Sequence, residues 1–200
     1  MQSRALESFR RLFCGPWYPT AIPWIVGAAA IFISLVSAPD LVGFLGAGLA
    51  VVAVAIAVID WRHLIIPDGL SATGLVLAFI HAAARNPDAA QWAIAMAAVR
   101  GVALVLVFVA LRSGYRSLRG RQGLGWGDVK LAGVAGAWLD WLTIPIALQL
   151  AALTAIAAYL LRQIVLGRPI SQTSRLPFGF FFAPAIWVCW LLEIRWLAPF

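Results

Sequence analysis

Long apolar runs separated by short polar segments make up almost the whole chain. A membrane-crossing helix needs about 20 mainly apolar residues, so this pattern predicts an all-α, polytopic transmembrane bundle of about seven spans. Clusters of proline, glycine, asparagine and aspartate, which favour turns, separate the runs. The spans are expected at residues 20–37, 41–60, 70–84, 91–111, 129–139, 142–161 and 178–197. The third and fifth are short, which requires protein or water to cover their ends.

The composition excludes a soluble domain, because 63% of the 200 residues are hydrophobic and only 12% are charged. The net charge of +7 could indicate nucleic acid, but the basic residues form short clusters between apolar runs. The positive-inside rule, by which basic loops face the cytoplasm, explains these clusters. We therefore expect the lipid bilayer, and no nucleic acid, as the partner. With about seven spans, the N-terminus and all clusters share the cytoplasmic side. These clusters contain Arg4, Arg10 and Arg11; Arg62; Arg112, Arg116, Arg119 and Arg121; and Arg162, Arg168 and Arg175.

The chain is expected to divide near residue 40. Residues 1–40 would form a basic N-terminal segment with the first transmembrane helix, and residues 41–200 the main membrane domain. Cys14 and Cys189 lie far apart and no C-x-x-C pair occurs, so we expect neither a disulfide nor a metal site.

Two aspartates interrupt the apolar pattern, and both are predicted to reach the cytoplasmic face. A carboxylate at membrane depth costs about 2.5–3.5 kcal/mol on insertion scales, so each is a candidate functional group. Asp60 closes an apolar run, where the low dielectric and the negative end of a helix dipole oppose ionisation. Asp128 begins an apolar helical run, where free N–H groups should lower its pKa. Alone, Asp60 could mark an interface and Asp128 could be a structural N-cap. Together they indicate one protonated acid and one ionised base.

Several nearby residues are candidates for supporting roles. Gly125 and Gly127 would let the backbone approach a substrate closely, or form a flexible connector. Lys130, the only lysine, could reach lipid headgroups or hold an acidic substrate group. Pro67 and Asp68 suit the start of a helix, which leaves Asp68 as a reserve carboxylate.

Three motifs in order resemble the type IV prepilin peptidase family, which consists of GxGD-type aspartic proteases of the membrane. The motifs are Asp60-Trp61-Arg62-His63-Leu64-Ile65-Ile66-Pro67-Asp68, then Gly125-Trp126-Gly127-Asp128-Val129-Lys130-Leu131, and then Leu176-Pro177-Phe178-Gly179. The resemblance covers the chain from about residue 41 onward. It implies that Asp60 and Asp128 are the catalytic pair, and the third motif adds Pro177 and Gly179 as supporting positions.

The resemblance also implies a substrate and a location. The family cleaves the basic leader of prepilins or pilin-like pseudopilins at the cytoplasmic face of the inner membrane, before a hydrophobic helix, in type IV pilus assembly and protein secretion. No cofactor is implied. Many relatives carry an N-terminal segment with zinc-binding cysteines and also methylate the product. This chain shows no such segment, so we expect peptidase without methyltransferase activity. The oligomeric state is not predicted.

A small proton-coupled transporter is the alternative function, because transporters also place paired carboxylates in membrane spans. Such a protein would need a path to the other face. The clustering of both aspartates at one face and the lack of an internal repeat favour the peptidase.

Overall fold

A computed structural model describes residues 21–38, 40–120, 123–166 and 177–197. Those residues form seven α-helices and no strands, so the predicted all-α bundle is confirmed and each predicted run gives one helix. The helices are α2 (Ile22–Ser37), α3 (Leu41–His63), α4 (Asp68–Arg85), α5 (Ala90–Arg119), α6 (Trp126–Trp138), α7 (Thr143–Leu166) and α8 (Phe178–Leu192). A 3-10 turn, η1 (Pro87–Ala89), precedes α5, and a π-helical turn, η2 (Glu193–Leu197), follows α8.

Several of the predicted features concern residues outside the described part of the chain. These are the basic residues Arg4, Arg10, Arg11, Arg121, Arg168 and Arg175, the side chain of Arg162, and Cys14.

Four of the described helical segments are long and apolar enough to cross a membrane. They are Leu41–His63, Pro87–Arg119, Thr143–Leu161 and Phe178–Trp196. Their large apolar side chains face outward in many places, as expected of a surface covered by lipid. The chain is therefore a multi-pass membrane protein, in which the shorter helices α2, α4 and α6 pack against the four long ones.

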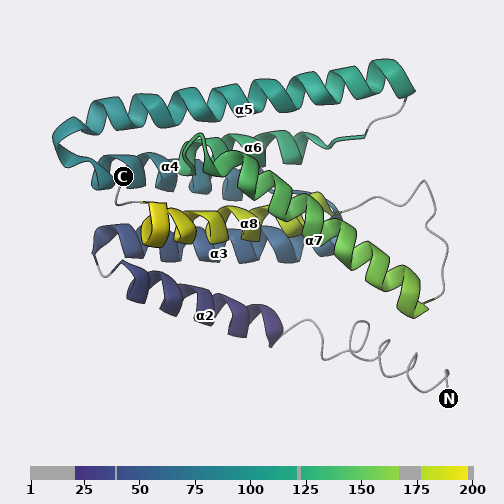
Figure 1. Cartoon of the computed structure of the whole chain (residues 1–200), viewed down its shortest axis with the longest axis horizontal. Coiled ribbons are helices and arrows are strands. Elements are labelled where there is room, and N and C mark those ends of the chain that lie inside the picture. Colours follow the sequence, from purple (N-terminus) through teal and green to yellow (C-terminus); the bar gives the residue numbers. More distant parts are fainter. Residues whose placement is uncertain (1–20, 39, 121–122, 167–176, 198–200) are drawn as a thin grey trace.

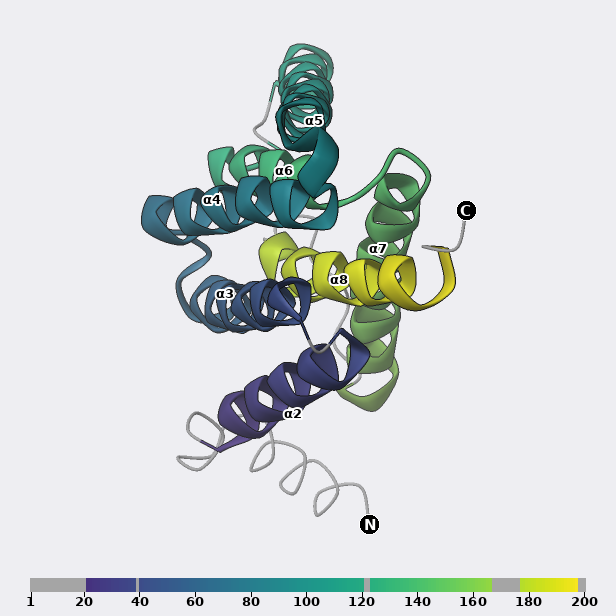
Figure 2. The same ribbon diagram turned by 90° about the vertical axis from the view of Figure 1, so that its left-hand side faces the viewer.

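The helices stack in layers that bring the ends of several of them together. α5 lies on α4 and α6, and these lie on α3 and α8, while α2 packs on α3 and α7 packs on α8 (Figures 1 and 2). The first residues of α4, α6 and α8 and the last residues of α3 meet at one end of this stack (Figure 1). Residues from both halves of the chain thus meet at that end.

α5 and α6 approach so closely that their backbones touch. A Cβ added at Gly136 of α6 would lie 2.5 Å from the Arg100 carbonyl oxygen and 2.9 Å from Gly101 Cα of α5. Small residues at such a crossing let two membrane helices gain van der Waals contact along their backbones. The side chain of Arg100 adds a hydrogen bond, because its Nε donates to the Gly136 carbonyl at 3.3 Å.

This close crossing predicts a different outcome for two glycine-to-alanine changes. Gly136→Ala is expected to destabilise the protein by about 1–3 kcal/mol, because the backbones of α5 and α6 must separate. Gly114→Ala on α5 is the control: its added methyl group meets nothing within 4 Å, and alanine is favoured in a helix by about 0.5–1 kcal/mol. Thermal unfolding of the purified protein in detergent measures both. Equal unfolding temperatures would contradict the assignment of this contact.

A polar cluster joins four elements at the opposite end of the stack. The Glu193 carboxylate, only 1% exposed, accepts hydrogen bonds from the Thr143 hydroxyl and, at 2.7 Å, from the Asp140 backbone N–H. Arg85 lies 3.4 Å from Glu193, and Arg100 lies 3.4 Å from Asp140. Each charge in this cluster thus has a partner of opposite sign, as burial requires.

Candidate active site

Asp60 lies in the last turn of α3, and the end of that helix shapes the site. Leu64 ends the helix in the left-handed region with φ 55°, and its N–H donates to the Asp60 carbonyl at 2.9 Å. A leucine in this region is uncommon, so the surrounding contacts must hold it there. The turn directs Ile66 inward, where it is only 5% exposed.

The carboxylate of Asp60 lies against the N-terminus of α8. Its Oδ2 accepts the Phe180 N–H at 2.9 Å, and the residue is only 5% exposed. A helix N-terminus offers free N–H groups and a positive dipole end, which suit an anionic group. This approach requires a glycine at 179, because an added Cβ would lie 3.0 Å from Asp60 Oδ2 and 2.8 Å from Ile66 Cδ1. Pro177 is the N-cap residue of α8.

Asp128 lies in the first turn of α6, close to Asp60. Its Oδ2 accepts the Gly125 N–H at 3.0 Å, which makes Asp128 part of the helix cap as well as a candidate catalytic group. Gly127 packs against Ile66, since an added Cβ would lie 3.0 Å from Ile66 Cβ. Ile66 therefore lies between the first turns of α6 and α8, which hold the two carboxylates.

The expected lowering of the Asp128 pKa is wrong. Burial raises the pKa of Asp128 to about 6 and outweighs the opposing hydrogen bond from Gly125. When Asp60 is ionised its negative charge raises this pKa further, while the positive charge of Arg112 lowers it. The sequence at the helix start shows only the local N–H groups. It does not show the burial or the second carboxylate, which the fold supplies from α3.

Lys130 and Asp68 form an ion pair between α6 and α4. The sequence did not predict this ion pair. Lys130 was expected either to reach lipid headgroups or to hold an acidic substrate group. The Asp68 side chain is 79% exposed and that of Lys130 44% exposed, so the pair contributes at most about 1 kcal/mol. Pro67 is the N-cap residue of α4, as its predicted place at a helix start requires. The pair leaves Asp68 at the rim of the site, away from the buried Asp60.

Arg112 is a site residue that the sequence did not indicate. It donates from α5 to the Leu124 carbonyl in the glycine-rich loop, and its guanidinium lies 4.8 Å from the centre of the Trp126 ring. From the sequence, positive-inside topology was the role expected of this arginine. No local signal distinguishes it from its basic neighbours, because its partners are contributed by the next segment of the chain. Ile66 was missed for the same reason.

The described residues contain no group of three or more histidine, cysteine, aspartate or glutamate side chains placed to hold a metal ion. The chemistry that these residues offer is that of a carboxylate pair. Two neighbouring carboxyl groups, one ionised and one protonated, can activate a water molecule and protonate a carbonyl or amine.

Comparisons with known proteins point to one family. The profile of the type IV leader peptidase family matches residues 47–161. The chain is 31% identical over 144 residues to a prepilin leader peptidase/N-methyltransferase of Aeromonas hydrophila, a match that covers 70% of this chain and 46% of that protein. It is 34% identical over 126 residues to the leader peptidase HopD of Escherichia coli, which covers 63% of this chain and 78% of HopD.

A third relative extends the match along the chain. The prepilin leader peptidase/N-methyltransferase of Dickeya chrysanthemi is 32% identical over 164 residues, or 82% of this chain and 56% of that protein. The chain thus spans about half the length of the two bifunctional relatives and most of HopD. No solved structure matches the chain.

Proposed function

Because the chain belongs to the type IV leader peptidase family, we propose that it is a membrane aspartic endopeptidase that removes the basic leader from prepilins or pilin-like proteins. One observation carries the proposal. Asp60 of α3 and Asp128 of α6 lie together at one end of the bundle, and each accepts a backbone N–H at the start of a helix. Each contact fixes one carboxylate, and the two groups are close enough for the charge of Asp60 to act on Asp128, as paired acid and base chemistry requires.

In the proposed mechanism Asp128 is the general base and Asp60 the general acid. Asp128 is partly exposed to solvent, and with a pKa of about 6 it is mainly ionised at neutral pH. It takes a proton from a water molecule, whose oxygen attacks the carbonyl carbon of the scissile bond. Asp60 enters this step protonated and donates its proton to the carbonyl oxygen.

Collapse of the tetrahedral intermediate completes the reaction. The carbon–nitrogen bond breaks, the leaving nitrogen takes the proton held by Asp128, and the hydroxyl proton returns to Asp60. The products are a carboxylic acid at the end of the leader and an amine on the mature chain. Both aspartates are then in their starting protonation states, so the cycle needs no cofactor.

We place the site at the cytoplasmic face of the inner membrane. Arg112, Arg116 and Arg119 lie near the C-terminal end of α5, at the end of the stack where α6 begins (Figure 1). At the other end, Arg85 and Arg100 pair with carboxylates. Clustered arginines favour the cytoplasmic side of a membrane, and this bias supports the orientation.

Cleavage of a defined substrate tests the function. The purified full chain in detergent is incubated with a prepilin that carries a basic leader, and the product is followed by gel shift and mass spectrometry. We expect one cut, at the junction of leader and apolar helix, and slower cleavage when the basic residues of the leader are neutralised. An uncut substrate, or cuts scattered along the chain, would refute the proposal.

The pKa of Asp128 sets the expected pH dependence of cleavage. A base must be ionised to accept a proton, so kcat/KM should fall as the pH drops through about 6, where Asp128 becomes protonated. Above this pH the value should level off, and it should fall again where Asp60 loses the proton that it must donate. Initial rates across a pH series, with a substrate that has no titrating group beside the scissile bond, measure the profile.

Arg112 provides the control for this assignment. Its positive charge lowers the pKa of Asp128, so Arg112→Gln should move the acidic limb of the profile to higher pH. Arg112→Lys keeps the charge and should leave the limb in place, even if the loss of contacts to Leu124 and Trp126 slows the reaction. A limb at the same pH in the glutamine variant would assign it to a group other than Asp128.

A further inference from the structure

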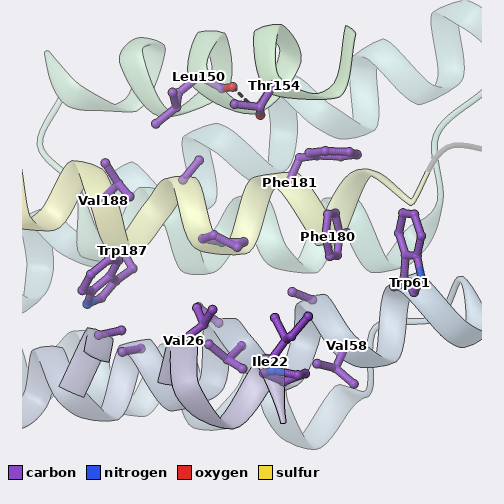
Figure 3. A pocket seen from close by; sticks show the side chains of 18 of the residues that line it. Ile22, Val26, Val58, Trp61, Leu150, Thr154, Phe180, Phe181, Trp187 and Val188 are labelled. Atoms are coloured by element: carbon purple, nitrogen blue, oxygen red, sulfur yellow. Dashed lines mark hydrogen bonds between the residues drawn. The ribbon is translucent and has the colours of Figure 1, made fainter. Parts of the chain in front are cut away.

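A long apolar groove lies beside the carboxylate pair. It has a volume of about 810 Å³, with α3 and α8 as its floor and α2 and α7 as its walls (Figure 3). Of the described residues that line it, only Arg62 is charged and only Thr154 carries a hydroxyl group. That hydroxyl group donates to the Leu150 carbonyl of its own helix at 2.7 Å, so the wall formed by α7 is effectively apolar.

One end of the groove is formed by the residues that hold Asp60. Trp61 follows Asp60 in the chain, and Phe180 donates its N–H to the Asp60 carboxylate; both side chains line the groove. Their rings lie 4.9 Å apart and close this end, while Trp187 lies at the other end (Figure 3). The groove therefore ends at residues that adjoin Asp60 in the chain or contact its carboxylate.

At the far end, a hydrogen bond joins the floor of the groove to one wall. The Trp187 Nε1–H of α8 donates to the Ser34 hydroxyl of α2 at 3.0 Å. Ser34 is fully buried, and its own hydroxyl donates to the Ala30 carbonyl at 2.8 Å. This arrangement fixes α2 against α8 at this end of the groove.

The dimensions and chemistry of the groove select an apolar helix as its occupant. The lining residues of α3 run from Ala50 to Arg62, a rise of about 18 Å, or roughly three turns of a parallel helix. An extended chain would leave its backbone groups without partners in such surroundings, whereas a helix satisfies its own. Ala53 and Ala57 of the floor are small enough for a helix backbone to approach closely.

We propose that this groove binds the apolar helical segment of the substrate that follows the cleaved bond. The inference rests on the function proposed above. A helix in the groove would end at Trp61 and Phe180, where its first residues leave the helical conformation beside Asp60. The groove would then set which bond reaches the carboxylate pair, because it fixes the position of the helix that follows.

A matched pair of substitutions on α2 tests the proposal. Val26 lines the groove and is 51% exposed, whereas Val36 lies outside it and is 59% exposed. Val26→Trp fills the groove and should raise KM for the full substrate by about 10- to 100-fold, equivalent to losing the burial of one large apolar side chain. kcat should change little, because the lost contact is the same in the bound substrate and in the transition state. Val36→Trp should match the wild type.

A second substrate separates the failure of this inference from failure of the proposed function. A short peptide that ends just after the cleaved bond lacks the helix, so the wild type and Val26→Trp should cleave it with equal, low efficiency. Cleavage of the full substrate by the wild type, with an unchanged KM in Val26→Trp, would overturn the groove alone. No cleavage of either substrate by the wild type would refute the peptidase function itself.

Photo-crosslinking identifies the occupant directly. A benzophenone amino acid at position 26 of the inactive Asp128→Asn variant should capture the helical part of the substrate, and the same probe at position 36 should not. Capture of only lipid, of residues 1–20 of the same chain or of a second copy at position 26, with substrate present, would overturn the assignment.

Discussion

Asp60→Asn and Asp128→Asn are each expected to abolish leader cleavage, with a loss of at least about 10²–10⁴-fold. Asparagine keeps the shape of the side chain and an oxygen that accepts the N–H of Phe180 or Gly125. It can neither take a proton from water nor donate a carboxylic acid proton. The folded structure should therefore persist while both proton transfers fail. Gel-shift assays of single-turnover cleavage, together with unfolding temperatures, measure the two properties separately.

Asp68→Asn is the matched control for these variants. Asp68 is also a carboxylate at the same end of the bundle, but it is exposed and pairs with Lys130. Loss of a surface ion pair costs at most about 1 kcal/mol, so this variant should cleave within a few-fold of the wild type. Activity retained in either of the first two variants would exclude the carboxylate mechanism. Loss in all three would add Asp68 to the catalytic group.

Gly179→Ala is expected to lower kcat by about 10²-fold, the size of effect that a 1 Å misplacement of a reacting group can produce. The added methyl group would lie 3.0 Å from Asp60 Oδ2 and 2.8 Å from Ile66 Cδ1. Ile66 can shift the end of its side chain, but the carboxylate must turn away from the Phe180 N–H. Steady-state kinetics should show the loss mainly in kcat, because the groove for the substrate is unchanged.

Gly69→Ala is the control for the general effect of adding a methyl group at the second residue of a helix. Gly69 is the second residue of α4, as Gly179 is the second residue of α8. An added Cβ at Gly69 meets nothing within 4 Å, so cleavage by this variant should equal that of the wild type. Equal losses in both alanine variants would mean that the effect comes from the helix start and not from contact with Asp60.

The helices were predictable from the sequence because each one needs only its own apolar run. The seven predicted spans correspond to α2 through α8, and proline or glycine residues lie at the predicted starts of α4, α6 and α8. The meeting of Asp60 and Asp128 at one end also followed, because loop charges fix the direction of each crossing. These predictions depend on the composition and on the order of residues within each segment, and both can be read from a single sequence.

The long-range contacts that define the site were not predictable, because they join residues that are distant in the chain. The Asp60 carboxylate meets a backbone N–H at Phe180, 120 positions away. The wrong sign for the pKa of Asp128 has the same origin, since the local helix cap was visible but the burial was not. The cluster around Glu193 was missed as well, although a glutamate in an apolar run was a signal that could have raised it as a candidate.

The short length of α6 has a consequence for where the chemistry takes place. Its 13 residues span about 20 Å, against about 30 Å for the hydrocarbon core of a bilayer. Its last residue lies beside the charged residues Arg100 and Asp140, which suit one surface of the membrane. In the proposed orientation, about 10 Å of the hydrocarbon core then lies beyond the first turn, and protein or water must fill this space. The proposed cleavage would therefore take place in a recess open to water, whose depth depends on the number of residues in α6. One more helical turn would raise Asp128 by about 5.4 Å toward the surface.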